Sequence, residues 1–178
     1  MGMKRLLVSI ALLSSSALCG GQTANHTATP QNIAPAQLQN VLALPLTQSV
    51  EQRQKYKLPL KAAYDRQIAL IGKDCETESN QGQQPYNICI GKADDQADSD
   101  FAVFYNNLQM LCHDQRQLAT LQASEHTWQQ YKDSAMEAAH AAWPNGTGAP
   151  GFAGEVYLSL VRNRMKELYK IYGLNISQ

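Results

Sequence analysis

The chain has 178 residues, of which 17% are charged, and its 15 basic side chains are matched by 15 acidic ones. This balance argues against a nucleic-acid-binding protein, which carries a strongly basic face. No segment beyond the first 21 residues has the roughly 20 apolar residues in a row that a membrane-spanning helix needs.

Residues 1–21 have the pattern of an export signal. Two basic residues, Lys4 and Arg5, precede a short apolar run that ends at Leu18, and small residues follow. We therefore expect cleavage near residue 21 and a periplasmic or secreted location. Lipidation of Cys19 is the alternative, but lipoprotein signals place Gly, Ala or Ser before the cysteine, and Leu18 stands there.

Residues 22–50 are rich in Gln, Asn, Ala, Thr and Pro and contain no charged side chain, which predicts a mostly disordered tether. We expect the folded domain at 51–178. Removal of residues 1–21 takes away two basic side chains and no acidic one. The exported chain then has 13 basic and 15 acidic residues, a net charge near −2.

The domain begins with two expected helices. The first covers about 59–73, because Pro59 suits a first helical turn and Tyr64 and Ile68 share one face. The second covers about 85–112 and has apolar residues at steps of three and four, the pattern of a long amphipathic helix. These seam residues are Tyr86, Ile90, Ala93, Ala97, Phe101, Phe104, Leu108 and Leu111.

Two further helices are expected at about 115–142 and 153–172, separated by a stretch rich in glycine and proline. Leu121 and Trp128 mark the inner face of the first of these, and Val161 and Leu168 that of the second. No strand-like alternation occurs. The pattern predicts an all-α domain, an antiparallel bundle of about four helices stapled by one disulfide.

Three cysteines follow the export signal. Cys75 and Cys89 are the expected disulfide, because the chain between them can easily fold back, in an oxidising compartment. Cys112 falls on the apolar edge of its helix, beside Leu111, and is expected to be a small buried side chain. A bridge from Cys112 to another chain is the alternative.

We find no pattern of residues that indicates catalysis, and we expect no enzyme, metal site or cofactor. Glu125 and His126 are neighbours in sequence and point about 100° apart on a helix, so they form no dyad. Asp133 is expected to pair with Arg162 or Arg164. The helix at 85–112 also carries several aspartates, which lack the spacing of a calcium loop and are expected to form a solvated face. They are Asp94, Asp95, Asp98 and Asp100.

Several short motifs occur in a characteristic order. They are the Cys75…Cys89 opening, Asp98-x-x-Phe101-x-x-x-Tyr105, Trp128-x-x-Tyr131-Lys132-Asp133 and Arg164-x-x-Glu167-Leu168. Together with the export signal, they resemble the lysozyme-inhibitor LprI-like domain of exported bacterial proteins, over about 75–172. The chain departs from that pattern at Ala102, where the family has Asn, and at Lys132, where it has Arg. A second cysteine pair, common in the family, is absent.

The resemblance implies a protein that binds lysozyme and inhibits it. The alternative is an envelope structural or protein-interaction module without inhibitory activity. Candidate partner-binding residues are Trp143, Asn145 and Phe152 in the glycine-rich stretch, whose alternative role is to cap the core. An acidic face at Asp94, Asp98 and Asp100 could attract a basic lysozyme.

Overall fold

A computed structural model describes residues 48–177 of the chain. Within these residues there are helices and no strands, which confirms the all-α prediction. The helices are α2 (Val50–Leu70), α3 (Glu76–Ser79), α4 (Gln83–Met110), α5 (Gln115–Ala142), α6 (Ala149–Ile171) and α7 (Gly173–Ser177). None of them is long and apolar enough to cross a membrane. The expected export signal and nearly all of the expected tether lie outside the described residues.

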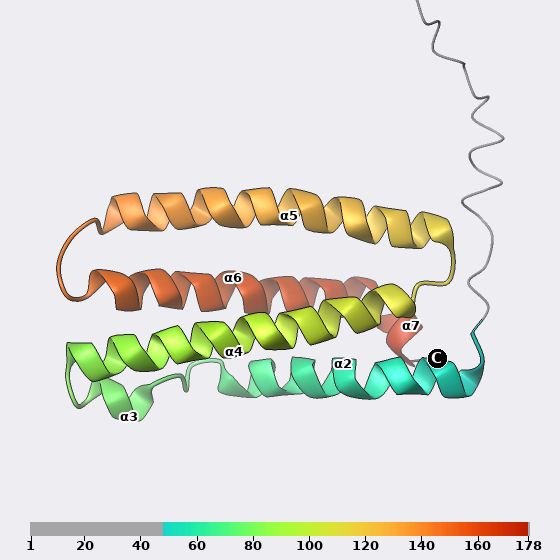
Figure 1. Cartoon of the computed structure of the whole chain (residues 1–178), viewed down its shortest axis with the longest axis horizontal. Coiled ribbons are helices and arrows are strands. Elements are labelled where there is room, and N and C mark those ends of the chain that lie inside the picture. The colour runs from blue at the N-terminus through green and yellow to red at the C-terminus, as the bar shows by residue number, and fades with distance from the viewer. Residues whose placement is uncertain (1–47, 178) are drawn as a thin grey trace, which may run out of the picture. The chain divides into compact units, whose positions relative to one another are not determined.

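The four long helices form the antiparallel bundle that the sequence predicts, each running opposite to the one before it (Figure 1). Helices α4 and α6 run in the same direction and pack against each other, with α2 packed mainly on α4 and α5 on α6. We call the end with the connections at 71–82 and 143–148 the tip. The opposite end, where α2 begins and α7 lies, is the base (Figure 1).

Glycines in α6 allow α4 and α6 to approach closely near the tip. A Cβ atom on Gly154 would overlap Cγ2 of Ile90, and one on Gly151 would lie 2.8 Å from Oδ1 of Asn87. Glycine is therefore required at both positions by the close packing of α4 and α6, and not by a positive φ angle. This packing of α6 on α4 explains why a sequence with two glycines is helical here and does not form a loop.

The expected start of the first helix is wrong. Helix α2 begins at Val50, nine residues before Pro59, and ends at Leu70. Ser49 caps it in a reciprocal arrangement with Gln52, each side chain accepting a hydrogen bond from the other's backbone N–H. Pro59 lies inside the helix and is half-buried. The cap, and the packing of the helix on α4, outweigh the local preference of proline for a first turn.

The other helix bounds agree better with the sequence pattern. Helix α5 has the expected bounds and α4 is shifted by two residues. Helix α6 begins at Ala149, four residues early, because Pro150 fits its first turn. The glycine-rich connection is therefore only 143–148 and Phe152 belongs to α6. A short helix, α7, follows the end of α6.

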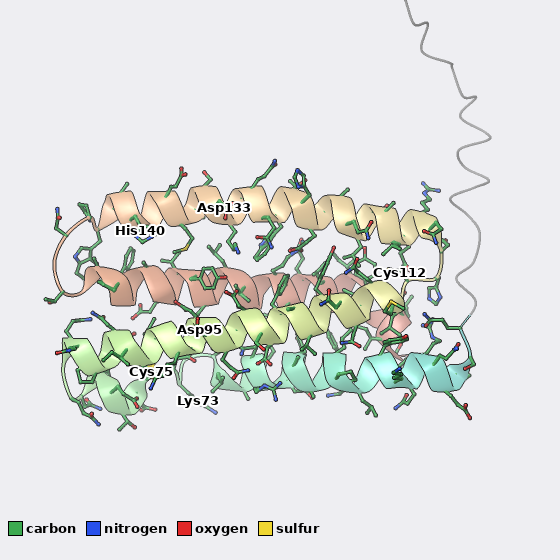
Figure 2. The ribbon with its side chains drawn as sticks, viewed as in Figure 1. Lys73, Cys75, Asp95, Cys112, Asp133 and His140 are labelled. Atoms are coloured by element: carbon green, nitrogen blue, oxygen red, sulfur yellow. A yellow bond between two sulfur atoms is a disulfide. The ribbon has the colours of Figure 1, made fainter. Side chains whose placement is uncertain are left out.

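The predicted seam of α4 lies inward, with Ile90, Ala97, Phe104 and Leu108 buried. It packs on buried side chains of the other long helices, which are Leu60, Leu121, Leu158, Val161, Met165 and Leu168. The Cys75–Cys89 disulfide is present, as expected. Cys112 is a buried free cysteine at the turn from α4 to α5 (Figure 2).

Candidate functional site

The motif residues of α4, α5 and α6 meet around the buried indole of Trp128. Its ring lies 5.2 Å from that of Phe101, and the Lys132 ammonium lies 5.4 Å from the Trp128 ring and 5.2 Å from the Tyr157 ring. The Tyr157 hydroxyl donates a hydrogen bond to Asp98. These contacts join α4, α5 and α6, so the role that the structure gives Trp128 and Lys132 is a structural one.

Arg164 extends the same cluster towards the base. Its guanidinium is nearly fully buried, lies 5.8 Å from the Trp128 ring, and donates to Glu125 at 3.3 Å and to Ser124 at 2.8 Å. Its third nitrogen, Nη1, donates to Glu167 at 2.9 Å. Burial of this guanidinium is tolerated because each side of it has an acceptor.

The expected partner of Asp133 is wrong. Asp133 is exposed on α5 (Figure 2), while Arg164 pairs with Glu125 and Arg162 pairs with Asp74. The helical phase explains this result. Glu125 is three residues from Trp128 and shares its inward face, whereas Asp133 is five residues away and turns about 140° from it.

The expected solvated acidic face is also partly wrong. Asp100 is 2% exposed and accepts hydrogen bonds from Arg66 at 2.7 Å and Gln67 at 2.7 Å. Burial alone would raise the pKa of Asp100, but the hydrogen bonds from Arg66 and Gln67 outweigh it and hold the pKa below its ordinary value. Asp100 is therefore too buried to contact a partner, contrary to the expectation that it forms part of a partner-binding acidic face. Its position, three residues after Ala97 and four before Phe104, places it on the seam and could have revealed its burial.

Asp94 and Asp98 lie closer to solvent. Asp94 is half-buried against Gly154, and its Oδ1 atom accepts no hydrogen bond from any described residue. Burial, followed by the charges of Asp98 and Asp95, raises the pKa of Asp94 to about 7. Of the three acids expected to meet a partner, only Asp98 is exposed. Asp95, expected only in the solvated face, is exposed as well.

The tip holds the predicted aromatic residues in a braced arrangement. Trp143 is 47% exposed, its ring lies 5.5 Å from that of Phe152, and it covers Gly148, where a Cβ atom would lie 3.0 Å from the indole. The connection is held on α4 because Asn87 donates a hydrogen bond to the Thr147 carbonyl at 2.7 Å. Asn145 is exposed.

The anchoring of the tip includes residues that the sequence reasoning did not single out. Asn87 accepts a hydrogen bond from Gln83 at 2.8 Å, and Tyr86 donates one to Glu155. Burial, with help from Glu155, raises the pKa of Tyr86 to about 12. No sequence motif marks these polar pairs, because they depend on which helix faces which across 60 or more residues.

Two other features near the tip have structural explanations. A groove of about 330 Å³ is lined by Tyr86, Asp74 and Arg162 among others, but Arg162 is already fully engaged by Asp74 and Gln67. The metal-ligating atoms of Cys75, Glu78 and Cys89 lie within 4.8 Å of one another. Because the two sulfurs are bonded to each other, they offer no thiolate to a metal ion.

A comparison with models of known protein families finds a match to the part of the chain that forms these contacts. The model of the family described as lysozyme inhibitor LprI matches residues 74–168, just over half of the chain. The chain belongs to the LprI lysozyme-inhibitor family. The match extends from the residue before Cys75 to the buried Leu168. It therefore includes the cluster around Trp128 and the whole connection at 143–148. Helix α2 of this LprI family member lies outside the matched range, although it supplies both donors to Asp100. No curated protein and no solved structure matches the chain.

Proposed function

We propose that this LprI family member is an exported protein that binds lysozyme and inhibits it by placing the tip of the bundle in the lysozyme cleft. Membership of the lysozyme-inhibitor family supports a lysozyme as partner. We assign the binding surface to Trp143, Asn145 and Phe152 at the tip, with the exposed aspartates Asp95 and Asp98 further along α4.

The observation that carries the proposal is the state of Trp143. Its indole is 47% exposed, yet it is braced by Gly148 and Phe152, and the Asn87–Thr147 hydrogen bond holds the loop beneath it. An aromatic side chain that is ordered before binding loses little conformational entropy on contact, which is the property of an interface anchor. Four packed helices support it from below.

The position and charge of the tip support the same surface. It lies at the opposite end of the bundle from Val50, the first residue of α2 (Figure 1), and α4 alone is 28 residues long. At 1.5 Å per residue, the tip lies about 42 Å from the base. Exposed acids lie in the tip half or near the middle of three helices and would speed the approach of a basic lysozyme. They are Asp95, Asp98, Asp133, Glu137 and Glu155.

The test is a titration of the chain from residue 22 onwards into lysozyme acting on a peptidoglycan suspension. We expect stoichiometric loss of clearing. Trp143→Ala should weaken inhibition by about thirtyfold or more, as expected for a central aromatic anchor. Tyr131→Ala is the matched control, because Tyr131 is 61% exposed on the outer surface of α5, and it should leave inhibition unchanged.

Three results would contradict the proposal in different ways. Equal inhibition by the wild type and a folded Trp143→Ala variant would remove the tip as the binding surface. Loss of inhibition in both variants would place the surface elsewhere. No inhibition of any lysozyme by a cooperatively melting wild type would favour the alternative, an interaction module of the cell envelope without inhibitory activity.

A further inference from the structure

The base of the bundle exposes apolar side chains that no packing contact explains. Val50 is 78% exposed, Leu174 is 73% exposed and Ile171 is 61% exposed. They come from three elements, the first turn of α2, helix α7 and the last turn of α6. Single exposed apolar residues are ordinary on a protein surface, so the question is whether these three form one surface.

Contacts between their neighbours bring the three side chains to one end of the molecule. Arg53, one turn after Val50, donates a hydrogen bond to the Asn175 carbonyl at 2.9 Å, and Asn175 follows Leu174. Asn175 in turn donates to the Leu111 carbonyl at 3.0 Å, which fixes α7 across the turn between α4 and α5. Figure 1 shows α7 beside the start of α2.

Ile171 belongs to the same end. It lines a hollow of about 290 Å³ with Tyr172 and the first turns of α5, where Arg116 and Thr120 lie. Leu174 is three residues further along the chain. We define the basal face as Val50, Ile171 and Leu174.

Several positive side chains lie at the same end of the bundle as the basal face. Arg116 and Lys170 are exposed beside it, and Arg53, Lys55 and Lys57 lie within two turns of Val50 on α2. Acids at the base are fewer. Glu51 is exposed, Asp114 is occupied as the cap of α5, accepting from the Gln117 backbone N–H at 2.7 Å, and Glu167 is paired with Arg164.

We propose that the basal face binds the surface of an anionic phospholipid bilayer. Charge complementarity selects this occupant, because exposed aliphatic side chains at an end of the bundle where Lys and Arg outnumber acids suit the boundary between acyl chains and anionic headgroups. The described part of the chain also begins at this end, at Gln48. A bundle held by its base presents the tip away from the membrane, but the inference does not depend on what the tip binds.

The test uses the chain from residue 22 onwards, which keeps every described residue, with sedimented vesicles of phosphatidylcholine alone or with one quarter phosphatidylglycerol. We expect binding to the anionic vesicles only, weakening as salt is raised. Ile171→Ser with Leu174→Ser should reduce the binding constant about tenfold or more, and Arg116→Glu with Lys170→Glu should abolish binding. Circular dichroism and thermal melting identify any variant that fails to fold.

The matched control lies at the other end of the bundle. Ile88 is 55% exposed and Lys92 is exposed on α4 near the tip, so Ile88→Ser with Lys92→Glu removes one apolar and one basic side chain away from the base. This variant should bind vesicles like the wild type. The tryptophan emission, which comes from buried Trp128 and from Trp143 at the tip, should stay unchanged on binding.

Four outcomes would overturn the proposal. They are equal binding to neutral and anionic vesicles, equal loss of binding in the tip control, and a blue shift of the tryptophan emission with vesicles. The fourth is absence of vesicle binding together with a wild-type dimer that Leu174→Ser dissociates, which would assign the basal face to a second copy of the chain.

Discussion

Asp100 of α4 and Arg162 of α6 do not touch, but both are bound by one completely buried side chain, the amide of Gln67 in α2. The Gln67 Nε2 atom donates to Asp100 at 2.7 Å, and its Oε1 atom accepts from Arg162 at 3.0 Å. Asp74 completes the neutralisation of Arg162, as Arg66 does for Asp100. Three helices are therefore joined through a single amide, and the Arg162–Asp74 pair ties the connection after α2 to them.

Replacing Gln67 by Met should destabilise the protein by about 2–4 kcal/mol. The substitution keeps the approximate volume but leaves a buried carboxylate and a buried guanidinium each short of a partner. Urea unfolding followed by circular dichroism measures the effect. Gln54→Met, on an exposed position of the same helix, is the control and should change the free energy of unfolding by less than about 0.5 kcal/mol.

Asp94 should make the free energy of unfolding depend on pH. Its pKa is raised to about 7 in the folded protein from 3.8, so the folded state favours the protonated carboxyl. Stability due to this group is complete below about pH 4 and is lost as the pH rises through 7. Asp94→Asn removes the titration and should be more stable than the wild type by about 1–2 kcal/mol at pH 8, a value reduced for solvent screening of a half-buried group.

Measurements of urea unfolding at pH 4 and pH 8 test this dependence on Asp94. The advantage of Asp94→Asn should be mostly lost at pH 4, where the wild-type carboxyl is protonated in the folded state and about half protonated in the unfolded chain. Asp95→Asn, on the exposed side of the same turn, should show no comparable difference between the two pH values. A constant advantage at both pH values would mean that ionisation is not its cause.

Two glycines should respond oppositely to alanine. Gly154→Ala places a methyl group against Ile90 and should cost about 1–3 kcal/mol, the usual cost of overpacking. Gly91 lies inside α4 and a Cβ atom there would meet nothing within 4 Å. Gly91→Ala should therefore stabilise the protein by about 0.5–1 kcal/mol. Thermal melts of the two variants compare them directly, and a Gly154→Ala variant as stable as the wild type would contradict the close approach of α4 and α6.

Cys112 should be unreactive in the folded protein. In the chain from residue 22 onwards it is the sole thiol, because Cys75 and Cys89 are bonded to each other. Burial, with a smaller effect of Asp114, raises the pKa of Cys112 to about 11, so little thiolate forms at pH 8. A disulfide-based thiol reagent should label less than one tenth of the protein in conditions where urea-unfolded protein is labelled fully. Rapid labelling of the native state would show that the α4–α5 turn opens.

The sequence by itself determined the helical class, the long seam of α4, the bounds of α5 and the Cys75–Cys89 bridge. These features depend on residues within about 30 positions of one another, where helical periodicity and loop length dominate. It also indicated the family, since the motifs around Trp128 occur in a fixed order. The start of α2 does not follow from Pro59, because Ser49 and Gln52 cap the helix earlier in the chain.

Tertiary structure alone decided the polar partners. Asp133 and Glu125 lie on one helix and both could reach an arginine, but only the facing of α5 and α6 selects Glu125 for Arg164. Likewise Asp100 is buried because α2 supplies Arg66 and Gln67 from more than 30 residues away. Local pattern assigns a residue to a helix face, whereas burial of a charge is settled by which donors the packed neighbours bring to it.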